Sequence, residues 1–152
     1  MIEDSGLGDI DKEIIKVLQS NSRVTLTFLS DKFNMTRNAI KYRIKNLEAK
    51  GYIIKYTTVL NPNKFGKKVT AIFHFNVPLH QIKTFSIKLR KYENITNIYF
   101  TTGQYSICAM GIFENHEELN RFLIDHLSKT SIREYVVSTV LERFKEQFYE
   151  LK

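Results

Sequence analysis

The residues best suited to chemistry are basic and lie close together between positions 37 and 55. This segment has six Lys or Arg residues and one acid, Glu48. Most of the bases recur at intervals that a helix would place on one outer side. Lys and Arg side chains arranged in this way can bind the phosphates of DNA. A neighbouring side-chain amide can recognise the edge of a nucleotide base in the major groove. The candidates for these roles are Arg37, Asn38, Lys41, Tyr42, Arg43 and Lys45.

Two of these candidates have a second role that the sequence leaves open. Arg43 could bind a phosphate, or it could stabilise the fold through an ion pair with an acidic side chain. Tyr42 could touch a thymine methyl group or a phosphate, or it could pack against the flank of its helix.

Three short helices are expected to position the basic segment. Apolar residues recur at helical spacing over 9–19, 25–33 and 36–50. The residues expected to face inward are Ile10, Ile14, Val17, Leu18, Leu26, Leu29, Phe33, Ile40, Ile44 and Leu47. Two short helices joined by a tight turn, the second with a basic outer side, match the helix-turn-helix plan.

Polar residues mark the ends of these helices. Thr25 and Thr36 are suitable N-caps, and the backbone N–H groups that follow them could point at phosphates, which makes both residues candidates for the interface. Asn34 is expected to end the second helix, because Asn tolerates the left-handed backbone conformation.

After Gly51 the chain changes character. Residues 52–60 are rich in β-forming side chains and could form a strand that leaves the first domain. Asn61-Pro62 and Gly66 then read as a turn. We therefore divide the chain into residues 1–61, which carry the helix-turn-helix, and residues 62–152.

The second part predicts a layered α+β domain. Strands and helices are expected to alternate over 69–77, 78–91, 95–102, 106–113, 115–127 and within 132–148. The order β-α-β-β-α-β is the ferredoxin-like pattern, in which two helices cover one face of an antiparallel sheet. The open face would carry apolar and aromatic side chains, so we expect it to pair with a second copy of the chain.

Composition excludes several classes of protein. The chain has 152 residues, a net charge of +7 and one cysteine, Cys108, which is expected to be buried and inert. The four histidines lack metal-binding spacing, so neither a metal nor another cofactor is predicted. No apolar run could span a membrane and the first residues do not resemble a signal peptide, so a cytoplasmic location is expected. The net charge of +4 in residues 62–152 needs no nucleic acid to explain it.

Several stretches resemble the Lrp/AsnC (feast/famine) family of transcription regulators. The opening residues 7–15 are similar to that family, as are the helix at 35–48 and the Gly51-Tyr52-Ile53 that follows. The positions that fall on the family pattern are Thr36, Arg43, Leu47, Glu48, Gly51, Leu60, Asn61, Pro62 and Gly66.

The resemblance implies a winged helix-turn-helix followed by an effector-binding and oligomerisation domain. It implies double-stranded DNA as the partner, recognised at near-palindromic promoter sites by homodimers that often assemble further, to tetramers or octamers. It also implies a small effector, often an amino acid, bound between dimers.

The resemblance also suggests where an effector would bind, and there the sequence departs from the family. In many relatives the turn between the second and third strands of the second domain reads Gly-x-Tyr-Asp, and the Asp often helps to hold the effector. Here Ser106 replaces this Asp, so either the ligand differs, or binding is weak, or no ligand binds. The effector candidates are Thr101, Thr102, Gly103, Gln104, Tyr105, Ser106, Ser138 and Thr139.

A second class of function is considered because tetrapyrrole (sirohaem-type) decarboxylases resemble this two-domain arrangement. Such an enzyme would need His and Arg residues lining a large cavity, and it would not need a basic third helix. The base-rich helix at 36–50 therefore favours a DNA-binding regulator, and no catalytic residue is predicted.

Overall fold

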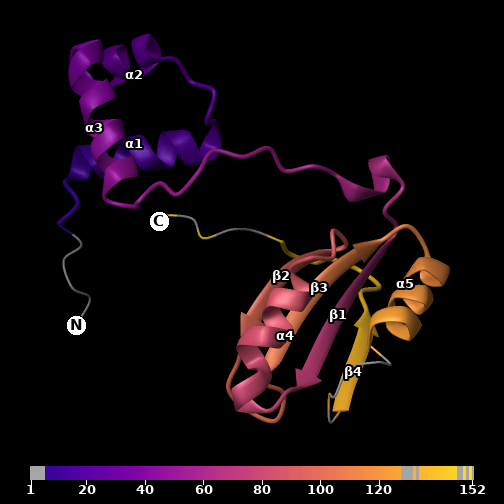
Figure 1. Ribbon diagram of the computed structural model, residues 1–152. Coiled ribbons are helices and arrows are strands. Elements are labelled where there is room, and N and C mark those ends of the chain that lie inside the picture. Colours follow the sequence, from indigo (N-terminus) through magenta and orange to yellow (C-terminus); the bar gives the residue numbers. More distant parts are fainter. Residues whose placement is uncertain (1–5, 128–131, 133, 147–148, 150, 152) are drawn as a thin grey trace. The chain divides into compact units, whose positions relative to one another are not determined.

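The chain forms two compact units in the computed structural model, which describes residues 6–127, 132, 134–146, 149 and 151. The first unit comprises residues up to Val59 and the described residues from Lys145 onward, and the second spans Leu60–Phe144 (Figure 1). The sequence division at 61/62 lies close to this border but assigned the C-terminal residues to the second domain. They group with the first unit because the Gln19 side chain hydrogen-bonds the backbones of Tyr149 and Leu151, at 2.9 and 3.0 Å.

The first unit contains the three predicted helices: α1 (Asp9–Ser20), α2 (Leu26–Phe33) and α3 (Arg37–Ala49). Their buried contacts come from Ile14 on α1, Leu29 on α2, and Ile40 and Leu47 on α3. Each fully buried aliphatic side chain of this kind contributes about 1.5–3 kcal/mol to folding. Ile10 was expected inside but is exposed, because it lies in the first turn of α1, at the edge of this small core.

The predicted strand at 52–60 is wrong. These residues adopt no regular secondary structure, and side chains such as Ile54 and Val59 are strongly exposed. β-forming residues make a strand only when a second strand takes up their backbone hydrogen bonds. The described residues of this single chain offer no such partner to the segment.

The second unit has the predicted β-α-β-β-α-β order, which confirms the ferredoxin-like α+β class. Its elements are β1 (Val69–Asn76), α4 (Ile82–Leu89), β2 (Ile95–Phe100), β3 (Ile107–Phe113), α5 (His116–Phe122) and β4 (Glu134–Thr139). The strands are antiparallel and ordered β2-β3-β1-β4. Short 3-10 turns precede β1 and α4, and a π-helical turn continues α5 to Leu127.

One face of this sheet is covered by α4 and α5 (Figure 1). Phe73 and Phe75 of β1 point into this layer, and the ring of Phe73 meets that of Phe122 on α5 at 5.7 Å. The ring of Phe85 on α4 packs against that of Phe75, with 5.1 Å between the ring centroids. This aromatic core fixes both helices to the same side of the sheet.

The opposite face of the sheet, here called the open face, carries no helix among the described residues. Register pairs place Cys108 beside His74 and Tyr99, and Met110 beside Ile72, on this face. Cys108 was expected to be buried, but it is half-buried, because its neighbours along β3 take the inward positions of the alternating strand.

The described helices are all too short or too polar to cross a membrane. In that same part of the chain, no three His, Cys, Asp or Glu side chains come together in a group that could hold a metal ion.

Candidate nucleic-acid interface

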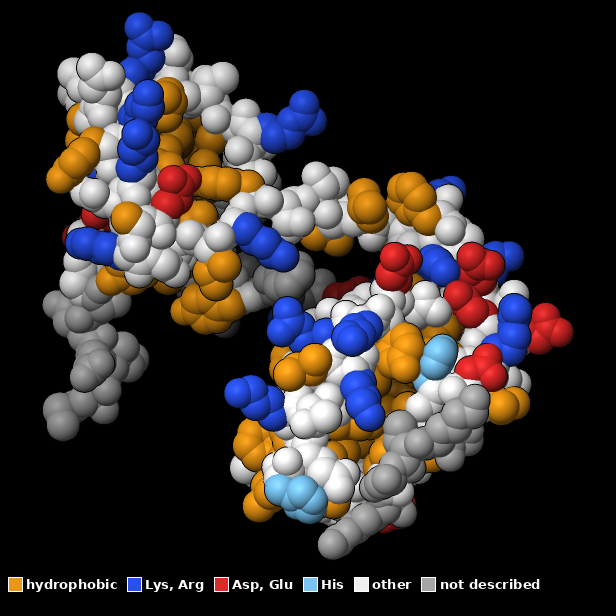
Figure 2. Space-filling model, in the orientation of Figure 1, with side chains coloured by type: hydrophobic (Ala, Val, Ile, Leu, Met, Phe, Trp, Pro, Cys, Tyr) orange, Lys and Arg blue, Asp and Glu red, His pale blue; other side chains and the backbone are white. Residues whose placement is uncertain are grey.

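One side of α3 presents the predicted basic surface. Arg37, Lys41 and Lys45 are exposed there, with Asn38 beside them, and Figure 2 shows the Lys and Arg side chains in a row over α3. Tyr42 is 67% exposed, which is too much for the packing role that the sequence left open. Ile40 and Leu47 are buried on the inward side of the same helix. Because that side packs into the core, the Lys and Arg side chains on the opposite side face solvent.

The turn between α2 and α3 is fixed by the predicted caps. The Thr25 and Thr36 hydroxyls accept hydrogen bonds from the backbone N–H groups of Phe28 and Ala39, at 3.1 and 3.2 Å. Asn34 has a φ of 50° and so ends α2 in the left-handed region. Both hydroxyls act as acceptors in these caps, so their own O–H groups and the backbone N–H groups of the first helical turns are left to donate to a phosphate.

Arg43 is held by the fold. Its Nη1 atom lies 2.8 Å from Oδ1 of Asp11 on α1, and the two side chains are 33% and 21% exposed. Together they border a pocket of about 320 Å³ between the start of α1 and α3, away from the row of bases. Of its two possible roles, the structure therefore shows the brace between helices.

Tyr56 is a residue of this region that sequence reasoning missed. Its hydroxyl donates to Oε1 of Glu48 at 3.0 Å. Burial, followed by this hydrogen bond and the negative charge of Glu48, raises the pKa of Tyr56 to about 12. The contact ties the irregular segment after α3 back to the end of that helix, although no spacing pattern in the sequence marks it.

The turn proposed to hold an effector uses most of its own hydroxyl groups. Thr101 Oγ1 donates to the Tyr105 carbonyl at 2.7 Å. Ser106 Oγ donates to the Val77 carbonyl at 2.9 Å and accepts from the Val77 N–H at 3.0 Å. Ser106 therefore fastens the end of β1, which is a structural role that the sequence did not predict.

The remaining effector candidates lie in different places. Thr102, Gly103 and Gln104 are exposed at the tip of the same turn, where Gly103 has a φ of 103°. Ser138 pairs with Ile72 in the sheet register, whereas Thr139 pairs with Ala71, so these two side chains point to opposite faces of β4.

Tyr105 completes the turn beside β1 and β4. Its ring lies 5.8 Å from that of His74, and its hydroxyl donates to Oε1 of Glu134 at 3.4 Å. Burial, then the charge of Glu134 and this hydrogen bond, raises the pKa of Tyr105. Within one chain, then, the predicted effector residues do not form a single site.

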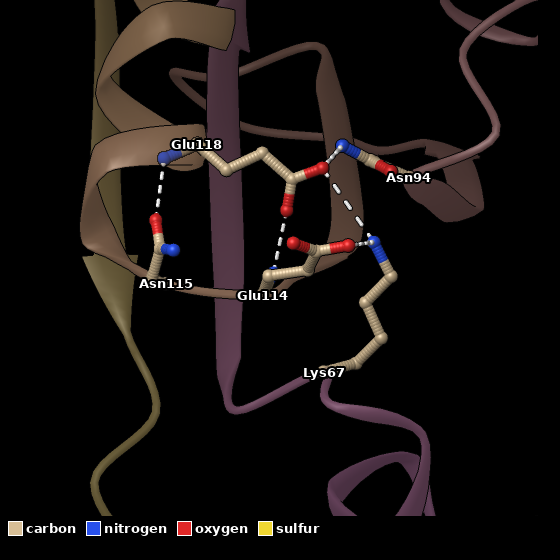
Figure 3. A network of polar contacts seen from close by, with 5 residues as sticks. All are labelled: Lys67, Asn94, Glu114, Asn115 and Glu118. Carbon is tan, nitrogen blue, oxygen red and sulfur yellow. Dashed lines mark hydrogen bonds and ion pairs between the residues drawn. The ribbon is translucent and has the colours of Figure 1, made fainter.

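A polar network joins three segments at the other end of the sheet (Figure 3). Asn115 caps α5 by accepting from the Glu118 N–H at 2.8 Å, and Glu118 in turn accepts from Asn94 at 3.0 Å and from the Glu114 N–H. Lys67 lies 3.4 and 3.5 Å from the Glu114 and Glu118 carboxylates. Burial alone would raise the pKa of Glu118, but these partners outweigh it and lower the pKa. The Asn-x-x-Glu spacing is a capping-box pattern that could have indicated this network.

Comparison with known proteins extends over nearly the whole chain. Residues 7–54 match a family model described as a winged helix-turn-helix DNA-binding domain, and residues 70–149 match the Lrp/AsnC ligand binding domain. An HTH-type transcriptional regulator of Pyrococcus horikoshii is 37% identical over 97% of this chain and 99% of its own length. The HTH-type transcriptional regulator FL11 of Pyrococcus furiosus is 38% identical over 77% of this chain and 78% of its own.

Solved structures share the fold. The chain is similar to AsnC of Escherichia coli, with a TM-score of 0.88 and 21% identity over 94% of this chain and 97% of that one. It is also similar to a transcriptional regulator of Neisseria meningitidis solved as an L-Met complex, with a TM-score of 0.85 and 23% identity over 92% and 93% of the two chains.

Proposed function

The chain belongs to the Lrp/AsnC family of transcriptional regulators, and we propose that it regulates transcription in the cytoplasm as a sequence-specific, double-stranded-DNA-binding homodimer or larger homo-oligomer. Its relatives are named as regulators, so the chain is a DNA-binding regulator and not an enzyme. The tetrapyrrole decarboxylase considered from the sequence is therefore not pursued.

The observation that carries this proposal is the outer side of α3. Arg37, Lys41 and Lys45 form no ion pair with any described residue, and Asn38 lies within the first turn beside them. A helix fits the major groove of B-DNA with its N-terminal residues near the base edges. Arg37, Asn38 and Lys41 are thus our candidates for base reading, and Lys45 for binding a phosphate.

A homodimer is supported by apolar surface that one chain leaves uncovered. On the open face Tyr99 of β2 is 51% exposed, and Val136 of β4 is exposed at the opposite edge of the sheet, in the same row of register partners. Ile54, Val59 and Leu60 add exposed apolar surface in the segment between the two units. Monomers rarely keep such surface in contact with water, and a second copy would bury it through a self-complementary contact. Two copies would also present two α3 helices to successive major grooves, roughly one helical turn apart.

Selection of DNA from a random pool, followed by titrations at several salt concentrations, tests the proposal. Lys45→Ala is expected to weaken binding to all sequences alike and to lower the salt slope by about 1. Asn38→Ala is expected to change the preferred sequence while leaving the salt slope unchanged. If Lys45→Ala alters neither affinity nor salt slope, α3 is not the DNA-binding surface.

We propose that the second unit binds a small effector such as an amino acid. The match to a ligand-binding domain supports this, as do the exposed side chains of Thr102 and Gln104 at the turn. Ser106 offers no charge and its hydroxyl is engaged, so the ligand would be held differently from one that pairs with an Asp. Ser138 could join Thr102 and Gln104 around one ligand only if copies of the chain assemble.

A thermal-shift screen of the common amino acids tests this part of the proposal, because a ligand that binds the native state raises its melting temperature. A shift that Gln104→Ala abolishes would support the turn as the site. No shift with any amino acid would identify a regulator that works without one.

A further inference from the structure

Helix α4 and the two residues after it form a second basic surface. Lys83, Lys88, Arg90 and Lys91 are all exposed, and no acid occurs between Ile82 and Lys91. None of these four bases forms an ion pair with a described residue, whereas Lys67 of the same unit does. We call this set of four side chains the α4 face.

The basic side chains of α4 lie apart from the acidic side chains of the second unit. Figure 2 shows Lys and Arg side chains, and no Asp or Glu, over α4, whereas acidic side chains lie together with Lys and Arg side chains on the side of α5. The acids there include Glu114, Glu117 and Glu118. The net charge of residues 62–152 is only +4, because acidic residues elsewhere in this half offset the four basic residues of α4 and its end. A single-sign surface of this kind focuses a positive field on one side of the unit.

The α4 face is comparable to the DNA-facing side of α3. It carries four bases without an ionic partner among the described residues, and α3 carries three, since Arg43 is held by Asp11. From Lys83 to Lys91 a helical path rises about 12 Å, at about 1.5 Å per residue. Phosphates along one DNA strand are spaced about 3.4 Å apart along the duplex axis, so three or four of them lie within this length.

The α4 face stays accessible when copies assemble through the open face. Phe85 and Leu89 bury the inner side of α4 against the sheet. The basic side of the helix therefore points away from the sheet, on the side opposite to the open face. A dimer formed there would present two α4 faces outward.

We propose that the α4 face binds the sugar-phosphate backbone of DNA that flanks the segment read by α3. This inference rests on the proposed DNA-binding function. Lys and Arg side chains supply contacts to the phosphate backbone, and such contacts carry no sequence information directly. The contact is therefore independent of sequence, and it lengthens the DNA that one oligomer engages.

The test compares the full-length chain with Lys88→Gln/Lys91→Gln on two duplexes. One duplex just covers the selected site, and the other extends it by about three helical turns of 10–10.5 bp on each side. On the long duplex the variant is expected to lose affinity severalfold and to lower the salt slope by about 2, one for each lost phosphate contact. On the short duplex it is expected to bind like the unaltered chain.

Two matched variants separate this inference from the function on which it rests. Lys64→Gln/Arg121→Gln removes the same amount of charge from exposed positions outside the α4 face. This variant should bind both duplexes with unchanged affinity. Lys45→Ala should weaken binding to both duplexes. An unchanged salt slope for the α4 variant on the long duplex, or an equal loss on both duplexes, overturns the α4 proposal while DNA binding by α3 stands. If Lys45→Ala has no effect either, the proposed DNA-binding role of α3, on which this inference rests, is refuted as well.

Discussion

Arg43 offers the sharpest separation between a role in folding and a role in DNA binding. It lies on the predicted recognition helix, yet its guanidinium contacts Asp11 of α1 at 2.8 Å. We expect Arg43→Gln to destabilise the chain and to leave the salt dependence of DNA binding unchanged.

The magnitude follows from the burial of the ion pair. Fully exposed pairs contribute about 0–1 kcal/mol, and removing one partner of a buried pair costs about 3–5 kcal/mol. The Arg43 and Asp11 side chains are 33% and 21% exposed, so we expect an intermediate loss of about 1–2 kcal/mol. In a chain of this length that corresponds to a fall in melting temperature of about 2–8 °C.

The assay is a double-mutant cycle between Arg43→Gln and Asp11→Asn, with the free energy of unfolding and the salt slope of DNA binding measured for each variant. If the two residues act through each other, the double variant should be less destabilised than the sum of the single variants. Lys45→Ala should show the reverse profile, with an unchanged melting temperature and a lower salt slope. A salt slope that falls by about 1 in Arg43→Gln, with no change in stability, would refute the brace and return Arg43 to the phosphate-binding set.

Three further predictions concern contacts that lie within one or the other unit. Thr36→Ala removes the N-cap of α3 and should lower the free energy of unfolding by about 1 kcal/mol, measured by urea denaturation, whereas Thr36→Ser should retain most of it. Ser106→Ala should cost about 1–3 kcal/mol in the same assay, because the Val77 N–H and carbonyl lose their shared partner. The pKa of Glu118 is lowered in the folded state, so its contribution to stability is present above its usual pKa of 4.5 and is lost as the pH falls through the lowered value. Glu118→Gln should therefore flatten the acid limb of a plot of melting temperature against pH, and an unaltered acid limb would exclude the network as its cause.

Local sequence rules predicted the helices of the first unit well. Thr25, Thr36 and Asn34 act at the helix ends as expected, because capping depends on a few neighbouring backbone groups. The strand predicted at 52–60 was wrong for the complementary reason. A strand needs hydrogen-bond partners from elsewhere, and β propensity does not supply them.

The site residues also fall into those that local sequence could predict and those that depend on contacts between distant segments. The exposure of Arg37, Lys41 and Lys45 follows from the position of the buried stripe on their own helix, so the sequence could predict it. The partner of Arg43 lies thirty-two positions away on α1, and no local pattern specifies that pairing. The engagement of Ser106 with the end of β1 is likewise a contact between distant segments.

The sequence by itself determined the element order, the helix ends and the concentration of bases on α3, because each depends on residues within one or two turns of one another. Tertiary structure alone decided which bases are neutralised, which hydroxyls are free and where the charge of the second unit gathers. Those properties depend on which segments the hydrophobic core brings together, as when Phe85 and Leu89 anchor α4 and leave its four bases facing solvent. A net charge is a sum over the chain, whereas a binding surface is an arrangement in space.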